Sequence, residues 1–183
     1  NTAHELGHKK SKLERNLATS VLAMGAYGHF AIEHNRGHHR HVATPEDCAS
    51  SRMGENIYRF AVRELPGGFL RAWRMEQGRL ERHEQPVWSL QNEILRAGLV
   101  TAVVSIALTV AFGPLMIAFL LGTYFFSAFQ LTSANYIKHY GLLRQKRANG
   151  HYERCQPQHS WNSNHICSNW ALYHLQRHSD HHA

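Results

Sequence analysis

The 183 residues suffice for one domain, and the formal net charge is +7. Three cysteines, Cys48, Cys155 and Cys167, lack C-x-x-C spacing, which excludes a disulfide framework and an iron–sulfur or rubredoxin-like site and favours a reducing compartment. Residues 97–137 contain no Lys, Arg, Asp or Glu. This uncharged stretch favours a membrane protein over a soluble one.

The first predicted helix lies around the sequence HELGHK. His4 and His8 are four residues apart, so an α-helix would point both imidazoles to one side. The pattern is formally the HExxH motif of zinc proteases, in which the glutamate, here Glu5, activates water. A protease is a minor alternative, because nothing else in the sequence predicts a peptide cleft and because many more clustered histidines follow.

An apolar segment, LATSVLAMGAYGHFAI at residues 17–32, leads to the second cluster. It is short for a membrane span, and it joins two clusters that should lie on the same side of a membrane. We therefore expect a helix lying in or against the protein. The cluster EHNRGHH follows, with His34 and His38 at helical spacing and His39 next to them.

Residues 42–96 form a polar, charge-mixed insertion that contains Pro45, Pro66 and Pro86. We expect short cytoplasmic helices and loops here, because proline inside a helix removes a backbone hydrogen bond. Residues 53–65 have the apolar spacing of an amphipathic helix. Packing against the rest of the protein is its expected role, and a membrane-surface role is the alternative.

Residues 97–134 are predicted to form a transmembrane helical hairpin. Two apolar runs are separated by Gly113 and Pro114, a dipeptide that breaks a helix, and about 20 apolar residues cross a bilayer. His39 and His139 flank this region and should meet at one centre, so the chain must cross the membrane an even number of times between them. Lys and Arg lie outside the hairpin, which by the positive-inside rule places the histidine clusters in the cytoplasm.

The C-terminal part begins with a lone histidine, His139, in NYIKHYG. Residues 141–168 are polar and loop-like, and Ser168 or Asn169 is expected to cap a last helix. This helix ends in LQRHSDHH, which carries the fourth cluster: His178, His181 and His182.

The clustered histidines indicate a metal site of the kind that binds zinc, copper, iron or nickel through neutral imidazoles. A two-metal centre is the economical interpretation, because even a six-coordinate ion would leave some of these side chains idle. The candidate ligands are His4, His8, His34, His38, His39, His139, His178, His181 and His182. Glu5, Glu33 and Asp180 stand next to ligands in sequence and would face away from the metal on a helix, so we expect them to orient imidazoles as hydrogen-bond acceptors.

Oxygen activation by iron is the chemistry that such a membrane site favours. An unactivated C–H bond offers side chains no acid, base or electrophile to work on, and two irons can share the electrons that O2 requires. Carboxylates are scarce in the clusters, unlike in the soluble di-iron bundles. Because the chain starts at Asn1 without an initiator methionine and stops directly after a histidine cluster, we expect residues 1–183 to be a single catalytic domain fragment of a longer protein.

Four segments together, HELGHK, EHNRGHH followed by VATPED, NYIKHYGLLR and LQRHSDHHA, resemble the successive signatures of the integral-membrane alkane 1-monooxygenases, relatives of the membrane desaturases and xylene monooxygenase. The resemblance covers the whole chain, and all nine histidines match the ligand positions of that family. It implies an all-α membrane helical bundle with a histidine-rich, non-haem di-iron site at the cytoplasmic face.

The same resemblance implies the reaction and its partners. An enzyme of this kind hydroxylates n-alkanes to 1-alkanols with O2, and it receives electrons from rubredoxin, which its reductase reduces. Membrane lipid would surround the helices, no nucleic acid would bind, and the protein would lie in the bacterial inner (cytoplasmic) membrane.

Three positions depart from the family pattern. His41 and Cys48 stand where Asp and Pro are commoner, and Lys138 precedes His139 where Glu is usual. An ammonium cannot accept a hydrogen bond from an imidazole, so Lys138 makes His139 the weakest candidate of the nine. His41 is expected to be exposed rather than a tenth ligand. The remaining histidines match no motif and are not expected to bind metal: His29, His83, His151, His159, His165 and His174.

Two alternative functions stay open. A desaturase or other hydroxylase of the same superfamily would use the same clusters on a different substrate, and a histidine-rich metal-binding or transport protein would hold metal without redox catalysis. The basic segments 9–15 and 144–147 are expected to be solvated faces or lipid-headgroup anchors, with a docking surface for an acidic electron carrier as the alternative.

Overall fold

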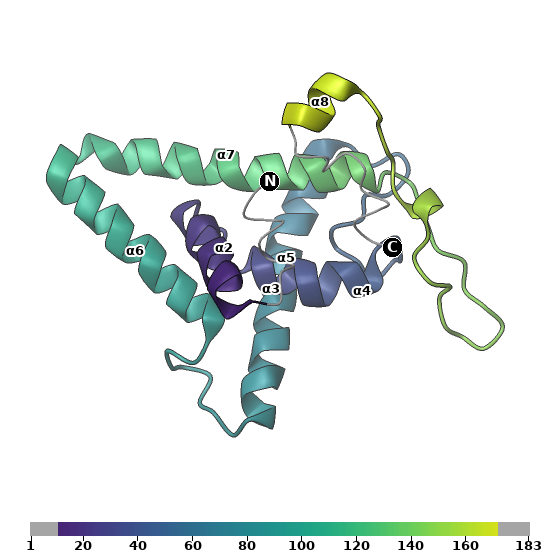
Figure 1. Ribbon diagram of the computed structural model, residues 1–183, viewed down its shortest axis with the longest axis horizontal. Helices are drawn as coiled ribbons and strands as arrows, with labels where there is room; N and C mark the ends of the chain where they lie inside the picture. The colour runs from purple at the N-terminus through teal and green to yellow at the C-terminus, as the bar shows by residue number, and fades with distance from the viewer. Residues whose placement is uncertain (1–10, 172–183) are drawn as a thin grey trace.

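The computed structural model describes residues 11–171, and its regular elements are helical (Figure 1). Helix α2 spans Lys12–Met24, α3 Phe30–Ile32, the π-helix η1 Glu33–His38, and α4 His39–His41. They are followed by α5 Ile57–Arg82, α6 Glu93–Phe112, α7 Leu115–Lys138, the 3-10 turn η2 Pro157–His159, and α8 Ile166–Ala171. Within residues 11–171 the only β-type pairing is an isolated bridge between Lys146 and Tyr152. The predicted all-α class is confirmed.

Helices α6 and α7 form a hairpin that projects from the body of the molecule (Figure 1). The Asn92 side chain caps α6 by accepting hydrogen bonds from the N–H groups of Ile94 and Leu95. Gly113 follows α6 with a φ of 87°, a left-handed conformation that glycine adopts without strain. Pro114 then leads into α7, where a missing N–H costs nothing.

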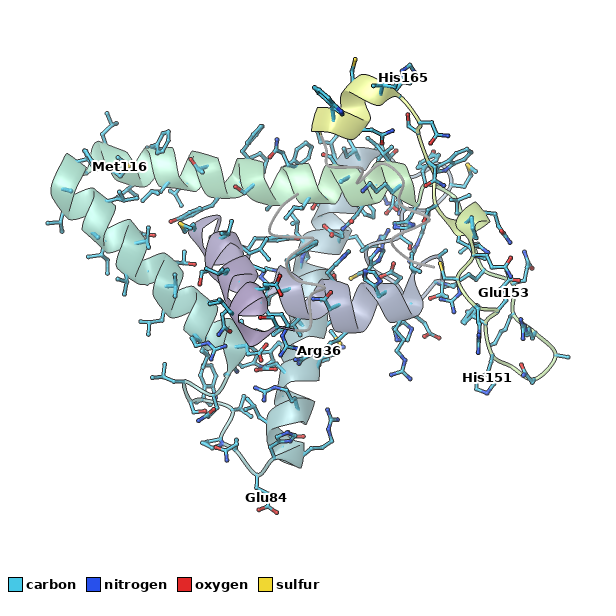
Figure 2. All side chains as sticks on the ribbon, viewed as in Figure 1. Arg36, Glu84, Met116, His151, Glu153 and His165 are labelled. Atoms are coloured by element: carbon cyan, nitrogen blue, oxygen red, sulfur yellow. The ribbon has the colours of Figure 1, made fainter. Side chains whose placement is uncertain are left out.

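The hairpin is long and apolar enough to cross a membrane twice. Both helices qualify by length and composition, and few of their side chains are buried within the protein. The turn lies at the predicted dipeptide, whereas the helices begin at Glu93 and end at Lys138, four residues beyond each end of the predicted 97–134. Figure 2 shows Met116 at the tip of the hairpin, at the opposite end of the molecule from Glu153.

Helix α5 runs from Ile57 to Arg82 without a break at Pro66. The expectation of short helices and loops across residues 42–96 is therefore wrong for this part. Proline removes the hydrogen bond of its own N–H and crowds the carbonyl four residues earlier, but α5 is supported on both sides of Pro66 by packing against α3, η1, α6 and α7. Apart from Ala61, its buried residues recur at every fourth position along one stripe: Phe60, Glu64, Gly68, Ala72, Glu76 and Leu80.

The apolar segment 17–32 is two helices rather than one. Helix α2 ends at Met24, and the chain turns, with Ala26 at a φ of 55°, before α3 begins. The turn lies close against α6, because a Cβ added to Gly28 would stand 2.4 Å from the Cβ of Ala97. Since α2 also packs against α6, the segment does lie against the protein.

Residues 141–160 fold back over the loop that follows α4. The Arg144 N–H donates to the Ala43 carbonyl at 2.7 Å, and the Gly141 N–H donates to the Ser51 carbonyl at 3.0 Å. The region is mostly loop, as expected. Helix α8 starts at Ile166, however, so neither Ser168 nor Asn169 caps it, and the cap prediction is wrong. These contacts bring the end of α7 next to the residues that follow the EHNRGHH cluster.

Candidate metal centre

A π-helical turn carries the EHNRGHH cluster. In η1 the hydrogen bonds run from residue i+5 to residue i, and the last of them joins the His39 N–H to the His34 carbonyl. Such a turn holds more than the 3.6 residues of an α-helix, so positions i+4 and i+5 both lie beside position i. The predicted i, i+4 pair of His34 and His38 is thereby extended, because the wider turn brings His39 to the same side.

Four predicted ligands meet at this turn. The ring centroid of His34 lies 5.3 Å from that of His38 and 4.7 Å from that of His39. His139, the residue after α7, comes from far along the chain, and its ring centroid lies 4.8 Å from that of His38. His34, His38 and His139 are buried and His39 is partly buried. The geometry thus joins two of the sequence clusters into one group of imidazoles.

The remaining predicted site residues lie outside the described residues 11–171. They are the ligand candidates His4, His8, His178, His181 and His182 and the acceptor candidates Glu5 and Asp180.

Asp47 orients the imidazole of His38. The Nδ1 atom of His38 lies 2.8 Å from Oδ2 of Asp47, and both side chains are fully buried. An ionised carboxylate can only accept, so Nδ1 carries the proton and the neutral ring offers Nε2 to a metal. Burial alone would lower the pKa of His38, but the charge and hydrogen bond of Asp47 outweigh burial and raise it.

Asp47 was missed in the sequence. It lies in VATPED, in the loop directly after the cluster, where Glu46 offers the same chemistry one position earlier. The structure distinguishes the two: Glu46 is exposed beside His41, whereas Asp47 is buried. Burial alone would raise the pKa of Asp47, but His38 and the guanidinium of Arg71 hold it well below its usual range. Asp47 is therefore a fixed anion behind the imidazole.

A backbone carbonyl orients His139. Its Nδ1 lies 3.2 Å from the carbonyl oxygen of His159, and a carbonyl can only accept. Burial, followed by the charge of His38, lowers the pKa of His139 to about 3, so this ring is neutral at neutral pH, as a metal ligand must be. The His159 carbonyl thus supplies a hydrogen-bond acceptor for His139, although position 138 holds a lysine in place of the Glu that is usual in the family. Lys138 is itself 9% exposed.

The spacing of two ring nitrogens fits a shared ion. The Nε2 atoms of His34 and His39 are 3.2 Å apart. With metal–nitrogen bonds of about 2.0–2.1 Å, two imidazoles on one ion are separated by roughly 2.9 Å at an octahedral angle and about 3.4 Å at a tetrahedral one. The donor set also fits, because neutral imidazoles suit iron as well as zinc, copper and nickel.

Glu33 is connected to the imidazole of His38 through Arg71 and Asp47. It is buried, it pairs with Arg71, and it accepts a weak hydrogen bond from the Cys48 thiol at 3.9 Å. Oxygen and sulfur atoms of Glu33, Asp47 and Cys48 all lie within 4.8 Å of one another. The Arg71 guanidinium binds both carboxylates, and burial raises the pKa of Cys48 to about 12, which keeps it a thiol. This group is an ion-pair cluster rather than a second cation site.

Glu64 connects α5 to the end of α7. Its carboxyl accepts from the Thr132 hydroxyl at 2.6 Å and from the Asn135 side-chain amide at 3.1 Å, and burial raises its pKa. Asn135 is one turn before His139, and its carbonyl accepts the His139 N–H. The hydrogen bonds of Glu64 therefore help to fix the position of His139 at the end of α7.

The histidines that were set aside lie apart from the four rings or contribute through the backbone. His41 is partly exposed, with Nδ1 3.3 Å from Glu46. His29 contacts Tyr27 and Phe69 through its ring. Of the others in the described range, His159 is buried. The remaining three are exposed: His83, His151 and His165. His174 lies outside the described residues.

The fold and the grouped imidazoles define a class: an all-helical membrane protein whose histidines gather where the apolar hairpin joins the body. The chain belongs to the fatty acid desaturase family, which matches residues 1–183 in full.

Three relatives with the same activity in their names match this chain over its whole length. The chain is 60% identical to an alkane 1-monooxygenase of Ectopseudomonas oleovorans and 61% identical to one of Pseudomonas putida, over 183 residues that make up 100% of this chain and 46% of each relative. An alkane 1-monooxygenase 1 of Alcanivorax borkumensis is 61% identical over 100% of this chain and 45% of its own length. The chain spans less than half the length of these relatives.

Proposed function

We propose that the protein containing this chain is an alkane 1-monooxygenase that converts n-alkanes to 1-alkanols with O2 at a histidine-ligated di-iron centre. The observation that carries the proposal is the meeting of four imidazoles from two distant segments, in a chain about three-fifths identical to alkane 1-monooxygenases over its whole length. The proposed ligands are those four and the five histidines outside the described residues.

The residues of this chain would prepare the imidazoles for iron. The bound metal would supply the redox chemistry for O2, which side chains lack. Asp47 and the His159 carbonyl hold protons on Nδ1 of His38 and His139, which directs Nε2 of each ring to the metal. Burial of both rings excludes water and strengthens these contacts.

The surroundings follow from the same proposal. The α6–α7 hairpin would cross the bacterial inner membrane, with the imidazoles on the cytoplasmic side, because Lys and Arg flank the hairpin and are absent within it. One oxygen atom enters the alkane and the other leaves as water, so electrons must arrive from a donor. We assign rubredoxin, with its reductase, to that role.

Product formation and metal content test the proposal together. Cells that express the full-length protein with rubredoxin and its reductase are given an n-alkane, 1-alkanol is measured by gas chromatography, and iron is measured in the purified protein. We expect the wild type to form 1-alkanol and to bind two irons. His139→Ala should lower both. His151→Ala, in an exposed loop, is the matched control and should match the wild type.

Other results would overturn the proposal. Unsaturated acyl lipid without 1-alkanol would favour a desaturase, in keeping with the family match. Bound zinc with no O2 consumption in the presence of alkane and reductant would favour a metal-binding protein. Full activity and iron content in His139→Ala would remove this residue from the ligand set.

A further inference from the structure

Arg71 joins two buried carboxylates behind the imidazoles. It lies on α5, and its Nη2 binds Glu33 and lies 2.7 Å from Oδ1 of Asp47. The Glu33 side chain is 4% exposed and that of Asp47 is 0% exposed. A buried carboxylate that loses its cation is strongly destabilised, so Arg71 fixes both the charge and the place of Asp47.

The two carboxylate oxygens of Asp47 have different hydrogen-bond partners. Oδ2 faces His38 at 2.8 Å and the Ser50 hydroxyl at 2.6 Å. Oδ1 faces Arg71 at 2.7 Å and the Ala49 N–H at a longer 3.2 Å. Without Arg71, Oδ1 would keep the long backbone contact, and the carboxylate plane could turn. The direction of the bond to His38 therefore depends on Arg71.

Gly37 provides the space for Arg71. This residue is part of the π-helical turn, and a Cβ added to it would stand 2.9 Å from Nε of Arg71 and 3.1 Å from Cε of Met75. The Met75 methyl can move aside, but Arg71 is held at its far end by two carboxylates. Gly37 has no positive φ. Glycine is thus required here for closeness and not for backbone conformation.

We propose that Arg71 is a positioning residue for the metal centre: it holds Asp47 so that the carboxylate aims the imidazole of His38, and Gly37 leaves the room for this contact. The inference rests on the proposed function, because it assumes that His38 binds metal. Partners that orient a ligating histidine typically change metal affinity by about 10–100-fold when they are removed.

Metal affinity tests this role without reference to turnover. Full-length protein is depleted of iron and titrated with Fe(II) against a competing chelator, and Mössbauer spectra are recorded. We expect Arg71→Gln and Asp47→Asn each to weaken iron binding by about 10-fold or more and to alter the spectrum. The double variant should be no weaker than Asp47→Asn alone, because Arg71 acts through Asp47.

A matched control and a milder variant complete the experiment. Arg74→Gln, on the exposed side of the same helix, should keep wild-type affinity and spectrum. Gly37→Ala retains every polar group but displaces Arg71, so it should weaken binding in the same direction. It decides the question if Arg71→Gln does not fold, as judged by circular dichroism.

The outcomes separate two kinds of failure. A wild type that binds no iron would overturn the proposed metal centre and this inference with it. A wild type that binds iron, with Arg71→Gln or Gly37→Ala indistinguishable from Arg74→Gln, would overturn the inference alone. Additive losses in the double variant would show that Arg71 does not act through Asp47.

Discussion

At the scale of single residues, two acceptors of different chemistry hold two rings in the same tautomer. Asp47 accepts from His38 and the His159 carbonyl accepts from His139, in both cases at Nδ1. The carboxylate raises the pKa of its ring, whereas burial lowers that of the other to about 3. Two neighbouring imidazoles therefore differ in basicity although both present Nε2.

His29 provides a pH-dependent prediction away from these rings. Its ring is partly buried against Tyr27 and Phe69, and burial lowers its pKa from 6.5 to about 4. Between these values the unfolded chain binds more protons than the folded one, so stability is complete above pH 6.5 and is lost as the pH falls towards 4. His29→Phe should reduce the difference in Tm between pH 7.5 and pH 5, measured by thermal unfolding in detergent.

His83→Phe is the control for that measurement. This histidine follows α5 and is exposed, so the Tm difference between the two pH values should equal that of the wild type. An equal difference in His29→Phe and the wild type would refute the assignment of His29 as a partly buried, neutral side chain.

At the scale of elements, α5 is the helix that positions the others. Glu64 binds α7, Arg71 binds η1 and the loop after α4, and Glu76 binds Arg36 and the backbone N–H of Glu93 at the start of α6. Figure 2 shows Arg36 close to the beginning of α6. Helix α5 thus makes polar contacts to η1 and to both helices of the hairpin, α6 and α7.

The crossing of the α2–α3 turn with α6 predicts a compensating exchange. Gly28→Ala should lower the Tm, because its Cβ would meet the Cβ of Ala97 at 2.4 Å and neither can rotate away. Ala97→Gly alone should cost about 1 kcal/mol through helix propensity. The double variant should recover much of the loss of Gly28→Ala in thermal unfolding.

Gly98→Ala provides the control for this exchange. A Cβ on Gly98 meets no atom within 4 Å, and alanine favours a helix over glycine, so the Tm should stay the same or rise. If the double variant is as unstable as the sum of the single ones, the crossing is not the cause of the loss.

The sequence predicted helices α6 and α7 because their apolar composition and the turn between them can be recognised within a short stretch of sequence. The uncharged runs around Gly113 and Pro114 indicated two helices and their turn without knowledge of the rest of the fold. The continuation of α5 through Pro66 depends on packing with four other elements, which no window of sequence contains. Tertiary contacts there outweigh the local preference of proline.

The sequence indicated which histidines group together, but not the residues that hold their rings in place. Histidine spacing indicated His34 and His38 as a pair, but an α-helical period does not describe a turn with i+5 to i bonds. The place of Asp47 depends on Arg71, and that of the His159 carbonyl depends on how residues 141–160 fold back. Such contacts join distant segments and leave no periodic signal.

At the scale of the whole molecule, Figure 2 shows Met116 at the hairpin tip and the loop with His151 and Glu153 at the opposite end. Proposed membrane crossing then predicts opposite accessibility for two positions in the full-length protein, in a background without native cysteines. Met116→Cys, at the tip, should react with an impermeant maleimide added to spheroplasts. Asn149→Cys, in the exposed loop near His151, should react only in inverted membrane vesicles. Labelling of both from the same side would contradict a spanning hairpin.

The π-helical turn has a consequence for how the chain can vary in length. Deleting one residue between His34 and His38 would place the two later histidines at positions i+3 and i+4 from His34, which share one face of a regular α-helix. The turn would then become α-helical with the three rings still on one side, whereas loss of a second residue would place the later histidines at i+2 and i+3 and rotate the first of them away. Substitution at the partly exposed Asn35 or the exposed Arg36 keeps this register. Related chains can therefore differ in composition within the turn and can lose one residue there, but the loss of a second residue would separate the rings.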